Sequence, residues 1–340
     1  MRPALLTEID NLPDGLLGIA ARDLHRVLDG PTLIHLPGRR EAPLFVSVLL
    51  HGNEDTGLVA IQTLLERYAG QELPRALSLF IGNVAAAREG RRRLDDQPDY
   101  NRCWPGTELP PGEETRMMAY IVQTMRRRQA FASVDVHNNT GLNPHYACIN
   151  RLDNAFLQLA VLFGRTVVYF IRPRGVASMA MAEVCPSTTL ECGKPGQAYG
   201  VEHAVEYLDA CLHLAEIPSH AVNGHDIDLF HTVAQVKVPD AFSFSFGHSA
   251  AHIAFDPELE RMNFREVPAG TEFGIVDALA NARLAAYDET GADVTDDYFE
   301  IRDQRILLRR AMMPSMLTLD ERVVRQDCLC YLMERMGSGR

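Results

Sequence analysis

Short apolar segments that alternate with helical patterns constrain the fold of this chain more than any other feature. The apolar segments are rich in aliphatic and β-branched residues, as buried strands are, and between them apolar residues recur at helical spacing. We predict strands at 32–36, 44–50, 77–81, 131–136, 167–171 and 188–190, and helices at 57–68, 113–128, 154–163 and 199–214. This alternation predicts an α/β fold with a mixed, mostly parallel sheet that is flanked by helices.

The pattern changes after about Ile217, where proline and glycine interrupt it and strand-like alternation follows. A chain of 340 residues also exceeds the usual size of one compact core. We therefore predict a catalytic α/β domain over residues 1–217 and a smaller β-rich domain over residues 218–340. The strand-like segments of the second part are 233–238, 241–246 and 273–276, and the segment 301–313 is expected to add further strands.

Composition excludes several classes of protein. The formal net charge of -12 argues against a nucleic-acid-binding surface, which needs concentrated positive charge. No apolar run approaches membrane-spanning length, and the N-terminal residues do not resemble a secretory signal. Seven irregularly spaced cysteines do not form the pattern of a disulfide framework. We expect a cytoplasmic protein with no nucleic-acid or membrane partner, and the sequence leaves a homo-oligomer open.

Two polar motifs stand where predicted strands end. His51-Gly-Asn-Glu54 follows the second strand, and Asp135-Val-His137 closes the fourth. Ligands bind at the carboxyl ends of strands in open α/β sheets, and histidine with glutamate is a ligand pair that zinc accepts. Residues two apart on a strand face the same side, so Asp135 is placed to hold the ring of His137. Taken alone, His51 with Glu54 is more often a chance pair at an ordinary strand end, and Asp135 with His137 is equally consistent with a surface-edge histidine that has an aspartate neighbour.

Glu191 closes the predicted strand at 188–190 and is followed by Cys192 and Gly193. A carboxylate at the end of a buried strand is partly desolvated, which raises its pKa toward the range of a general base. The alternative is a carboxylate that simply emerges at the edge of the sheet.

Arginines supply candidate anion contacts. Asn101-Arg102 combines a planar guanidinium, which suits a carboxylate, with an amide that can add a hydrogen bond. Arg172 and Arg174 follow the strand at 167–171 and are candidates for a further contact. The basic stretch Arg88–Arg93 is equally consistent with a solvated face.

Taken in order, these motifs resemble the zinc carboxypeptidase clan, and within it the succinylglutamate desuccinylase/aspartoacylase family. His51-Gly-Asn-Glu54 looks like the first zinc motif of that family. The second zinc motif is matched by the residues from Asp135 to Thr140, and the strand of the catalytic glutamate by Thr189-Leu-Glu191-Cys-Gly193. Where the family usually has Asp-Leu-Asn-Arg, this chain has Asp99-Tyr-Asn101-Arg102 after a longer loop. The resemblance covers about residues 40–215.

The resemblance implies one Zn²⁺ per chain, with His51, Glu54 and His137 as ligands and Glu191 as general base. It implies that Arg102 acts with Asn101 on the substrate, and that a further carboxylate-binding arginine is Arg92 or Arg93. The implied activity is removal of an acyl group from a small anionic N-acyl amino acid. The alternatives are a metallocarboxypeptidase that releases a C-terminal residue from peptides and a catalytically silent zinc- or ligand-binding protein.

Overall fold

A computed structural model describes residues 2–247 and 251–337 of the chain. It contains two compact units. Unit 1 comprises the chain up to Asn138 together with His145–Asp228, and unit 2 comprises Asn139–Pro144 together with the chain from Leu229 onward. The domain boundary expected after residue 217 stays a prediction, since a compact unit is not by itself an independent domain.

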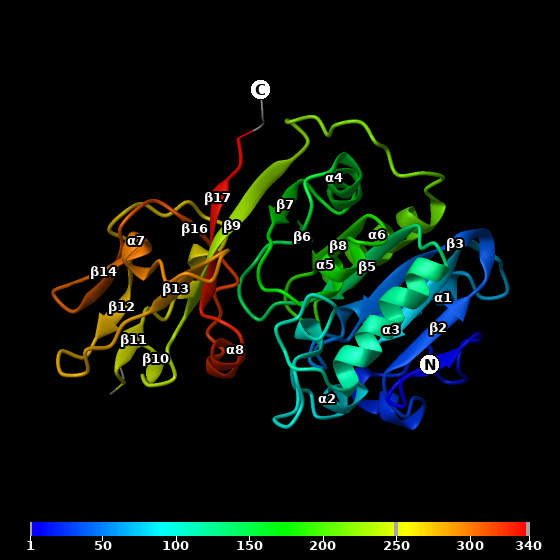
Figure 1. Cartoon of the computed structure of the whole chain (residues 1–340), viewed down its shortest axis with the longest axis horizontal. Helices are drawn as coiled ribbons and strands as arrows, with labels where there is room; N and C mark the ends of the chain where they lie inside the picture. The colour runs from blue at the N-terminus through cyan, green and yellow to red at the C-terminus, as the bar shows by residue number, and fades with distance from the viewer. Residues whose placement is uncertain (1, 248–250, 338–340) are drawn as a thin grey trace. The chain divides into compact units, whose positions relative to one another are not determined.

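The sheet of unit 1 is mixed and mostly parallel, as predicted. Its strands lie in the order β1-β2-β4-β3-β5-β8-β6-β7. Figure 1 labels β2, β3, β5, β6, β7 and β8 of this sheet. Neighbouring strands are parallel except in the pairs β2–β4 and β6–β8. The strands are β1 (Thr7–Ile9), β2 (Thr32–Leu36), β3 (Gly38–Val48), β4 (Leu73–Ile81), β5 (Ala132–His137), β6 (Tyr146–Ile149), β7 (Thr166–Tyr169) and β8 (Ser187–Glu191).

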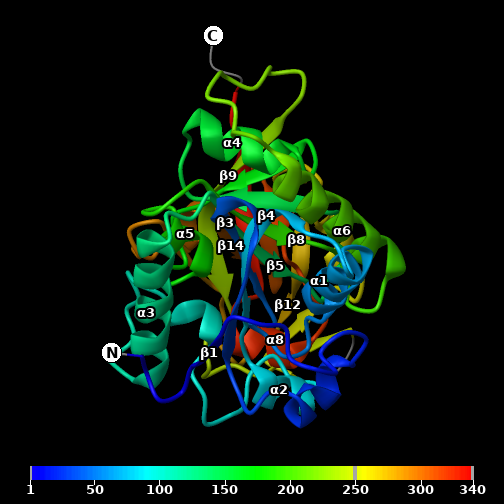
Figure 2. The same cartoon turned by 90° about the vertical axis from the view of Figure 1, so that its right-hand side faces the viewer.

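Helices cover both faces of this sheet. Figure 2 shows α1 (Thr56–Arg67) and α6 (Ala198–His213) on one face, and α3 (Glu113–Arg127) and α5 (Ala177–Met181) on the other. The apolar side of α3 packs with Trp104, whose ring meets Phe45 of β3 edge to face at 6.4 Å. Also in unit 1 are α2 (Val84–Arg88), α4 (Asn154–Val161) and the 3₁₀ helices η1 (Ala21–Arg26) and η2 (Tyr100–Arg102).

The four predicted helices are confirmed to within two residues at each end, and each predicted strand of unit 1 overlaps an observed one. The strand expected at 44–50 is longer at its start, because β3 begins at Gly38 with charged residues that carry no apolar signal. Both strands that the sequence did not indicate, β1 and β6, are only three or four residues long. Segments of that length are too short for periodicity to reveal them.

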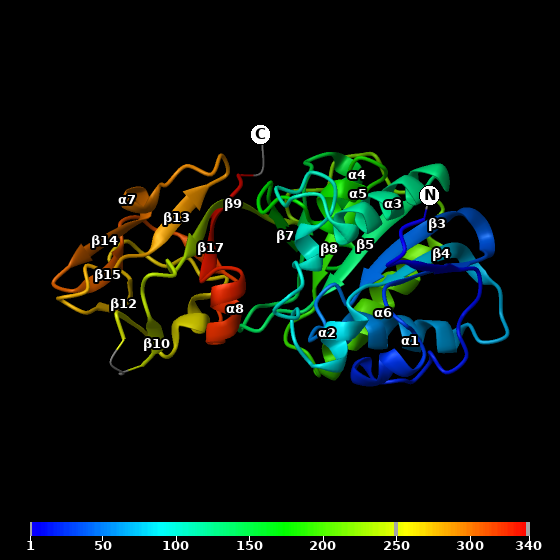
Figure 3. The ribbon, with the colours of Figure 1, turned by 60° about the horizontal axis from the view of Figure 1, so that its bottom comes forward.

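Unit 2 is rich in β-structure, as predicted for the C-terminal part. β9 (Asp228–Lys237) pairs with β17 (Cys330–Arg335) and β13 (Ala285–Asp288), and β17 pairs with β16 (Met313–Ser315). A separate five-stranded sheet has the order β10-β11-β12-β15-β14. Figure 3 labels β10, β12, β14 and β15 of this sheet. Its strands are β10 (Phe244–Phe246), β11 (Ile253–Phe255), β12 (Glu272–Val276), β14 (Phe299–Arg302) and β15 (Arg305–Leu308), and the helices of the unit are η3 (Leu259–Met262), α7 (Thr295–Tyr298) and α8 (Glu321–Gln326).

The segment Asn139–Pro144 belongs to unit 2 although it directly follows β5 and Asn138. The side-chain oxygen of Asn143 accepts the backbone N–H of Met316 at 2.9 Å. Gly141 lies so close to this part of the chain that a Cβ would stand 1.8 Å from the carbonyl oxygen of Leu317. Only glycine therefore fits at position 141.

None of the helices in the described part of the chain is long and apolar enough to cross a membrane.

Candidate metal centre

Three neighbouring parallel strands, β3, β5 and β8, end at the same edge of the sheet of unit 1. Val48 of β3 is in register with Val136 of β5, and His137 of β5 is in register with Glu191 of β8. Because parallel strands share one carboxyl edge, the residues that end or follow these strands lie together. This edge is the usual place for ligands in an open α/β sheet.

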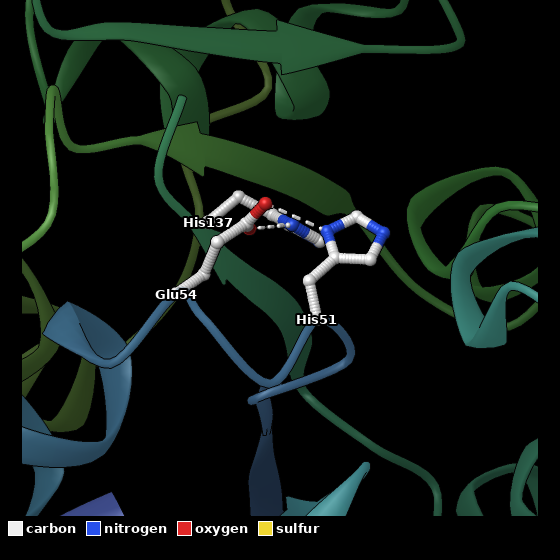
Figure 4. Close-up of side chains that lie close together, drawn as sticks. All are labelled: His51, Glu54 and His137. Carbon is white, nitrogen blue, oxygen red and sulfur yellow. Dashed lines mark hydrogen bonds and ion pairs between the residues drawn. The ribbon is translucent and has the colours of Figure 1, made fainter. Parts of the chain in front are cut away.

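The carboxylate of Glu54 bridges the two imidazole rings of His51 and His137, with one oxygen bound to each ring (Figure 4). Its Oε1 is 2.8 Å from Nδ1 of His51, and its Oε2 is 2.8 Å from Nδ1 of His137. All three side chains are buried, and their ligand atoms lie within 4.8 Å of one another. Two imidazole nitrogens and one carboxylate form a donor set that zinc accepts, so the cluster could hold a metal ion.

Both histidines use the outward ring nitrogen, Nε2, to bind a second carboxylate. Nε2 of His137 lies 2.8 Å from Oδ2 of Asp135, and Nε2 of His51 lies 3.1 Å from Oδ1 of Asp99. The hydroxyl of Ser47 donates to the other oxygen of Asp135 at 2.6 Å. A carboxylate at Nε2 holds the ring and leaves Nδ1 as the inward-facing nitrogen, which is how metal-binding histidines are oriented.

Asp99 is a residue that sequence reasoning did not assign to the site. It stands at the start of the Asp99-Tyr-Asn101-Arg102 motif, and that position was the available signal. Its spacing from His51 carries no local pattern, because the two residues are 48 positions apart and meet only in the fold.

The charged side chains of the cluster shift one another's pKa values in opposite directions, down for the carboxylates and up for His137. Burial alone raises the pKa of Glu54, but the charges and hydrogen bonds of His51 and His137 outweigh it, and the net pKa is far below normal. Burial lowers the pKa of His137, yet Asp135 and Glu54 outweigh burial and raise it well above normal. The pKa of Asp99 is likewise well below normal, because Arg92 and His51 outweigh its burial. The carboxylates of Glu54 and Asp99 are thus ionised, and the positive charge that favours this state comes from His51, His137 and Arg92.

The turn that carries His51 and Glu54 is tightly built. Leu49 adopts a φ of 54°, an unusual left-handed conformation that turns the chain out of β3. Gly52 approaches α2 so closely that a Cβ would lie 2.1 Å from the backbone nitrogen of Ala87. The turn geometry explains why glycine stands between the two metal-ligand candidates.

Glu191 lies at the end of β8, beside His137 on one side and Tyr146 of β6 on the other. It is buried, with 7% of its surface exposed. Burial, and after it the charge of Glu191, raises the pKa of the Cys148 and Cys192 thiols, so both remain neutral. The described structure therefore places a buried carboxylate, with no thiolate beside it, at the edge that carries the metal-ligand candidates.

Asn101 and Arg102 lie in η2. Nδ2 of Asn101 stands 3.3 Å from Nε2 of His137, and its Oδ1 accepts the backbone N–H of Ala177 at the start of α5. Because Nε2 of His137 donates to Asp135, the approach of Asn101 is proximity and not a second strong hydrogen bond. Arg102 donates from Nη1 to the carbonyl oxygen of Asn101 at 2.9 Å.

The structure separates Arg92 from Arg93. The side chain of Arg92 is 9% exposed. It donates to Oδ2 of Asp99 from Nε at 3.3 Å and from Nη2 at 3.0 Å, and its Nη1 is 3.6 Å from Oε1 of Glu54. Arg93 instead donates to the carbonyl oxygen of Gln97 at 2.9 Å, within its own loop. Arg92 thus lies at the metal-ligand cluster, whereas Arg93 contacts loop backbone.

Arg172 and Arg174 lie after β7. Arg172 pairs with Glu108 at 3.3 Å, and Arg174 is exposed. No contact described for either arginine reaches the three metal-ligand candidates, so their role as anion contacts stays a prediction.

Residues 43–200 match the model of the succinylglutamate desuccinylase/aspartoacylase catalytic domain. Over these residues, which are less than half of the chain, the protein is similar to the succinylglutamate desuccinylase/aspartoacylase family. The resemblance stated from the motifs is thereby confirmed. The names of the family describe deacylases, so the match supports an enzyme that removes acyl groups.

Solved structures agree on the fold. Succinylglutamate desuccinylase from Chromobacterium violaceum has a TM-score of 0.55 and 18% identity, covering 88% of this chain and 87% of that chain. Succinylglutamate desuccinylase/aspartoacylase from Rhodobacter sphaeroides has a TM-score of 0.57 and 17% identity, covering 90% of this chain and 88% of that chain. Murine aminoacylase 3 has a TM-score of 0.51 and 15% identity, covering 88% and 96%. No curated protein sequence matches the chain.

Proposed function

We propose that the chain is a zinc-dependent amidohydrolase that removes the acyl group from a small anionic N-acyl amino acid. The observation that carries this proposal is the buried cluster of His51, Glu54 and His137. It lies at the edge of the sheet where β8 ends with Glu191. Three protein ligands suit a catalytic zinc, because a structural zinc uses four. We therefore expect one zinc per chain.

The family match supports the deacylase part of this proposal, and the chemistry of the site supports zinc. When bound, zinc polarises a carbonyl group and lowers the pKa of a water molecule toward about 7. Asp135 and Asp99 hold the two histidine rings so that both Nδ1 atoms face the carboxylate of Glu54.

Glu191 acts as the general base in this proposal. Its carboxylate takes a proton from the attacking water and passes that proton to the leaving nitrogen, so that the amide bond breaks into an acid and an amine. Burial at the end of β8 limits its hydration, which suits proton transfer near neutral pH.

The arginines are proposed to recognise the anionic group of the substrate. Arg102 supplies a planar guanidinium, whose Nη1 donates to the carbonyl oxygen of Asn101, and the side-chain amide of Asn101 lies beside His137. Arg92 lies nearer to the cluster than Arg93 does, but it already binds Asp99. We therefore assign substrate recognition first to Arg102, with Asn101 beside it, and keep Arg92, Arg93, Arg172 and Arg174 as further candidates.

The function is tested with zinc-loaded protein and two sets of substrates at equal concentration, N-acyl amino acids and peptides of four or more residues. We expect release of the acid from one or more N-acyl amino acids. Faster release of C-terminal residues from the peptides would contradict the deacylase proposal and favour a carboxypeptidase.

Glu191→Gln is the variant that tests the mechanism. Glutamine keeps the shape of the side chain but cannot accept the proton, so turnover should fall by about 10²–10⁴-fold. Zinc content, measured by elemental analysis, should equal that of wild type. Activity within about threefold of wild type would remove Glu191 from the mechanism, since loss of a positioned base costs far more.

A further inference from the structure

Asn138 immediately follows the metal-ligand candidate His137 and is almost completely buried, with 2% of its surface exposed. Its backbone and its side chain reach three segments that all belong to unit 1. We propose that Asn138 is a positioning residue, which fixes the turn of Glu54 relative to the strand end of Glu191. This inference rests on the proposed function in so far as Glu191 is the base.

The first link runs to a metal-ligand candidate. The backbone N–H of Asn138 donates to Oε2 of Glu54 at 3.2 Å. The same oxygen accepts from Nδ1 of His137 at 2.8 Å. The carboxylate of Glu54 is therefore oriented by two adjacent residues of β5 and the loop that follows it.

The second link runs to the start of α1. Oδ1 of Asn138 accepts the backbone N–H of Thr56 at 3.2 Å. The first N–H groups of a helix have no partner inside the helix and need an acceptor from elsewhere. Asp55 stands at the capping position but makes no capping bond with its side chain. Asn138 supplies this acceptor two residues after Glu54.

The third link runs to the chain beyond the proposed base. Nδ2 of Asn138 donates to the carbonyl oxygen of Gly193 at 2.9 Å, two residues after Glu191. Only one orientation of the amide satisfies both Thr56 and Gly193, because the first contact needs an acceptor and the second needs a donor. One amide group thus connects the start of α1 with the end of β8.

The bridge made by Asn138 fixes the separation between the metal-ligand candidate Glu54 and the proposed base Glu191. The turn that carries Glu54 leads into α1 at Thr56, and Gly193 lies two residues after β8 ends at Glu191, so the Asn138 amide bridges the two segments. A misplacement of about 1 Å at a reacting group can cost about 10²-fold in rate. Loss of the bridge is therefore expected to act on turnover more than on substrate binding.

The test uses Asn138→Ala, which removes both side-chain bonds, and Asn138→Asp, whose carboxylate can still accept from Thr56 but offers Gly193 no N–H. We expect kcat to fall by about 10–100-fold in both variants, as for loss of supporting partners at metal sites. The KM should change by less than about threefold, because an effect on turnover and not on binding is expected of positioning. If the alanine variant fails to fold, the aspartate variant, which keeps the shape of the side chain, is used to test the expected loss of kcat.

Asn150→Ala is the matched control. Asn150 is also buried, and its Nδ2 donates to a single backbone carbonyl oxygen, that of Phe170, at 2.9 Å. It lies just beyond the end of β6, and its described contacts do not include the metal-ligand candidates. The control should lose stability but keep kcat. An equal loss of kcat in the control, or no loss in the Asn138 variants, would overturn the proposal.

A second measurement separates this inference from the proposed function. Cobalt(II) is added to metal-stripped protein, and its visible absorption spectrum is recorded for wild type, both Asn138 variants and the control. If wild type hydrolyses no N-acyl amino acid, the proposed function fails and the spectrum alone decides the role of Asn138. A spectrum altered only in the Asn138 variants then supports positioning, and a spectrum unchanged from wild type overturns it.

Discussion

Two buried histidines in unit 1 have similar surroundings at first sight, but the structure gives them different properties. His35 lies in β2 and His137 ends β5, and each is exposed by less than 5%. Nδ1 of His35 lies 2.9 Å from the hydroxyl oxygen of Ser78, and its Nε2 lies 3.1 Å from Oε1 of Glu8. His137 has a carboxylate at each ring nitrogen instead.

The pKa shifts of the two rings are opposite in direction. Burial lowers the pKa of His35, and Glu8 offsets this effect only in part. For His137, burial acts in the same direction, but Asp135 and Glu54 together outweigh it. One carboxylate and a hydroxyl thus leave a buried histidine neutral, whereas two carboxylates create a place for positive charge. Within this pair, the second carboxylate is what distinguishes the metal-ligand candidate His137 from the ordinary buried histidine His35.

The largest expected effect separates the two histidines by metal binding. His137→Ala should lower zinc affinity by more than the roughly 10–100-fold that loss of a supporting partner costs, because it removes a ligand atom. His35→Ala should keep stoichiometric zinc and lose stability by about 1–3 kcal/mol, the cost of leaving buried partners unsatisfied. Zinc titration and urea unfolding measure the two quantities. Zinc bound by His137→Ala with wild-type affinity would refute the ligand assignment.

An intermediate loss of zinc affinity is expected when the carboxylates that bind Nε2 of the two histidines are changed. Asp135→Asn and Asp99→Asn should each lower zinc affinity by about 10–100-fold, because an amide holds the ring less firmly and carries no charge. Glu8→Gln, the corresponding change at His35, should leave zinc affinity unchanged. Competition with a chelator of known affinity measures all three. Equal losses in all three variants would show that general destabilisation, and not ring orientation, is responsible.

The smallest effect concerns pH. The folded-state pKa of His35 is lowered, so below about pH 6.5 the unfolded chain takes up a proton that the folded chain does not. Stability is therefore lost as pH falls through this range, by at most about 1.4 kcal/mol per pH unit. The pKa of Glu8 is also lowered, which adds a loss of stability at still lower pH.

His35→Gln removes this titration and should make unfolding free energy less dependent on pH between 7 and 5. The control is His213→Gln, at an exposed histidine of α6. Urea unfolding of metal-free protein at several pH values measures the difference from wild type. A slope that stays the same in His35→Gln would show that His35 is not the group that titrates.

The metal-ligand candidates could be found from the sequence because each stands where an apolar strand ends. His51, Glu54 and His137 are marked by local spacing, and Asp135 is marked by its distance of two residues along a strand. The layered α/β fold follows from the same alternation of strands and helices. These features depend on residues close together in the chain, which is why local patterns reveal them.

What the sequence could not show depends on contacts between distant segments. The order β3-β5-β8 brings the three strand ends together, but no single segment encodes that order. The partnership of Asp99 with His51 and the bridge made by Asn138 are also long-range contacts. The choice between Arg92 and Arg93 depends on how one loop folds, because adjacent residues there point to different partners.

The six residues from Asn139 to Pro144 have a consequence for how this gene can be recombined. They are encoded between His137 and β6, yet they belong to the compact unit formed by the chain from Leu229 onward. A truncation after residue 228 leaves Asn143 without the Met316 N–H that it accepts. The C-terminal part therefore cannot be exchanged between relatives as one continuous cassette, and a successful chimaera must carry both pieces from the same parent.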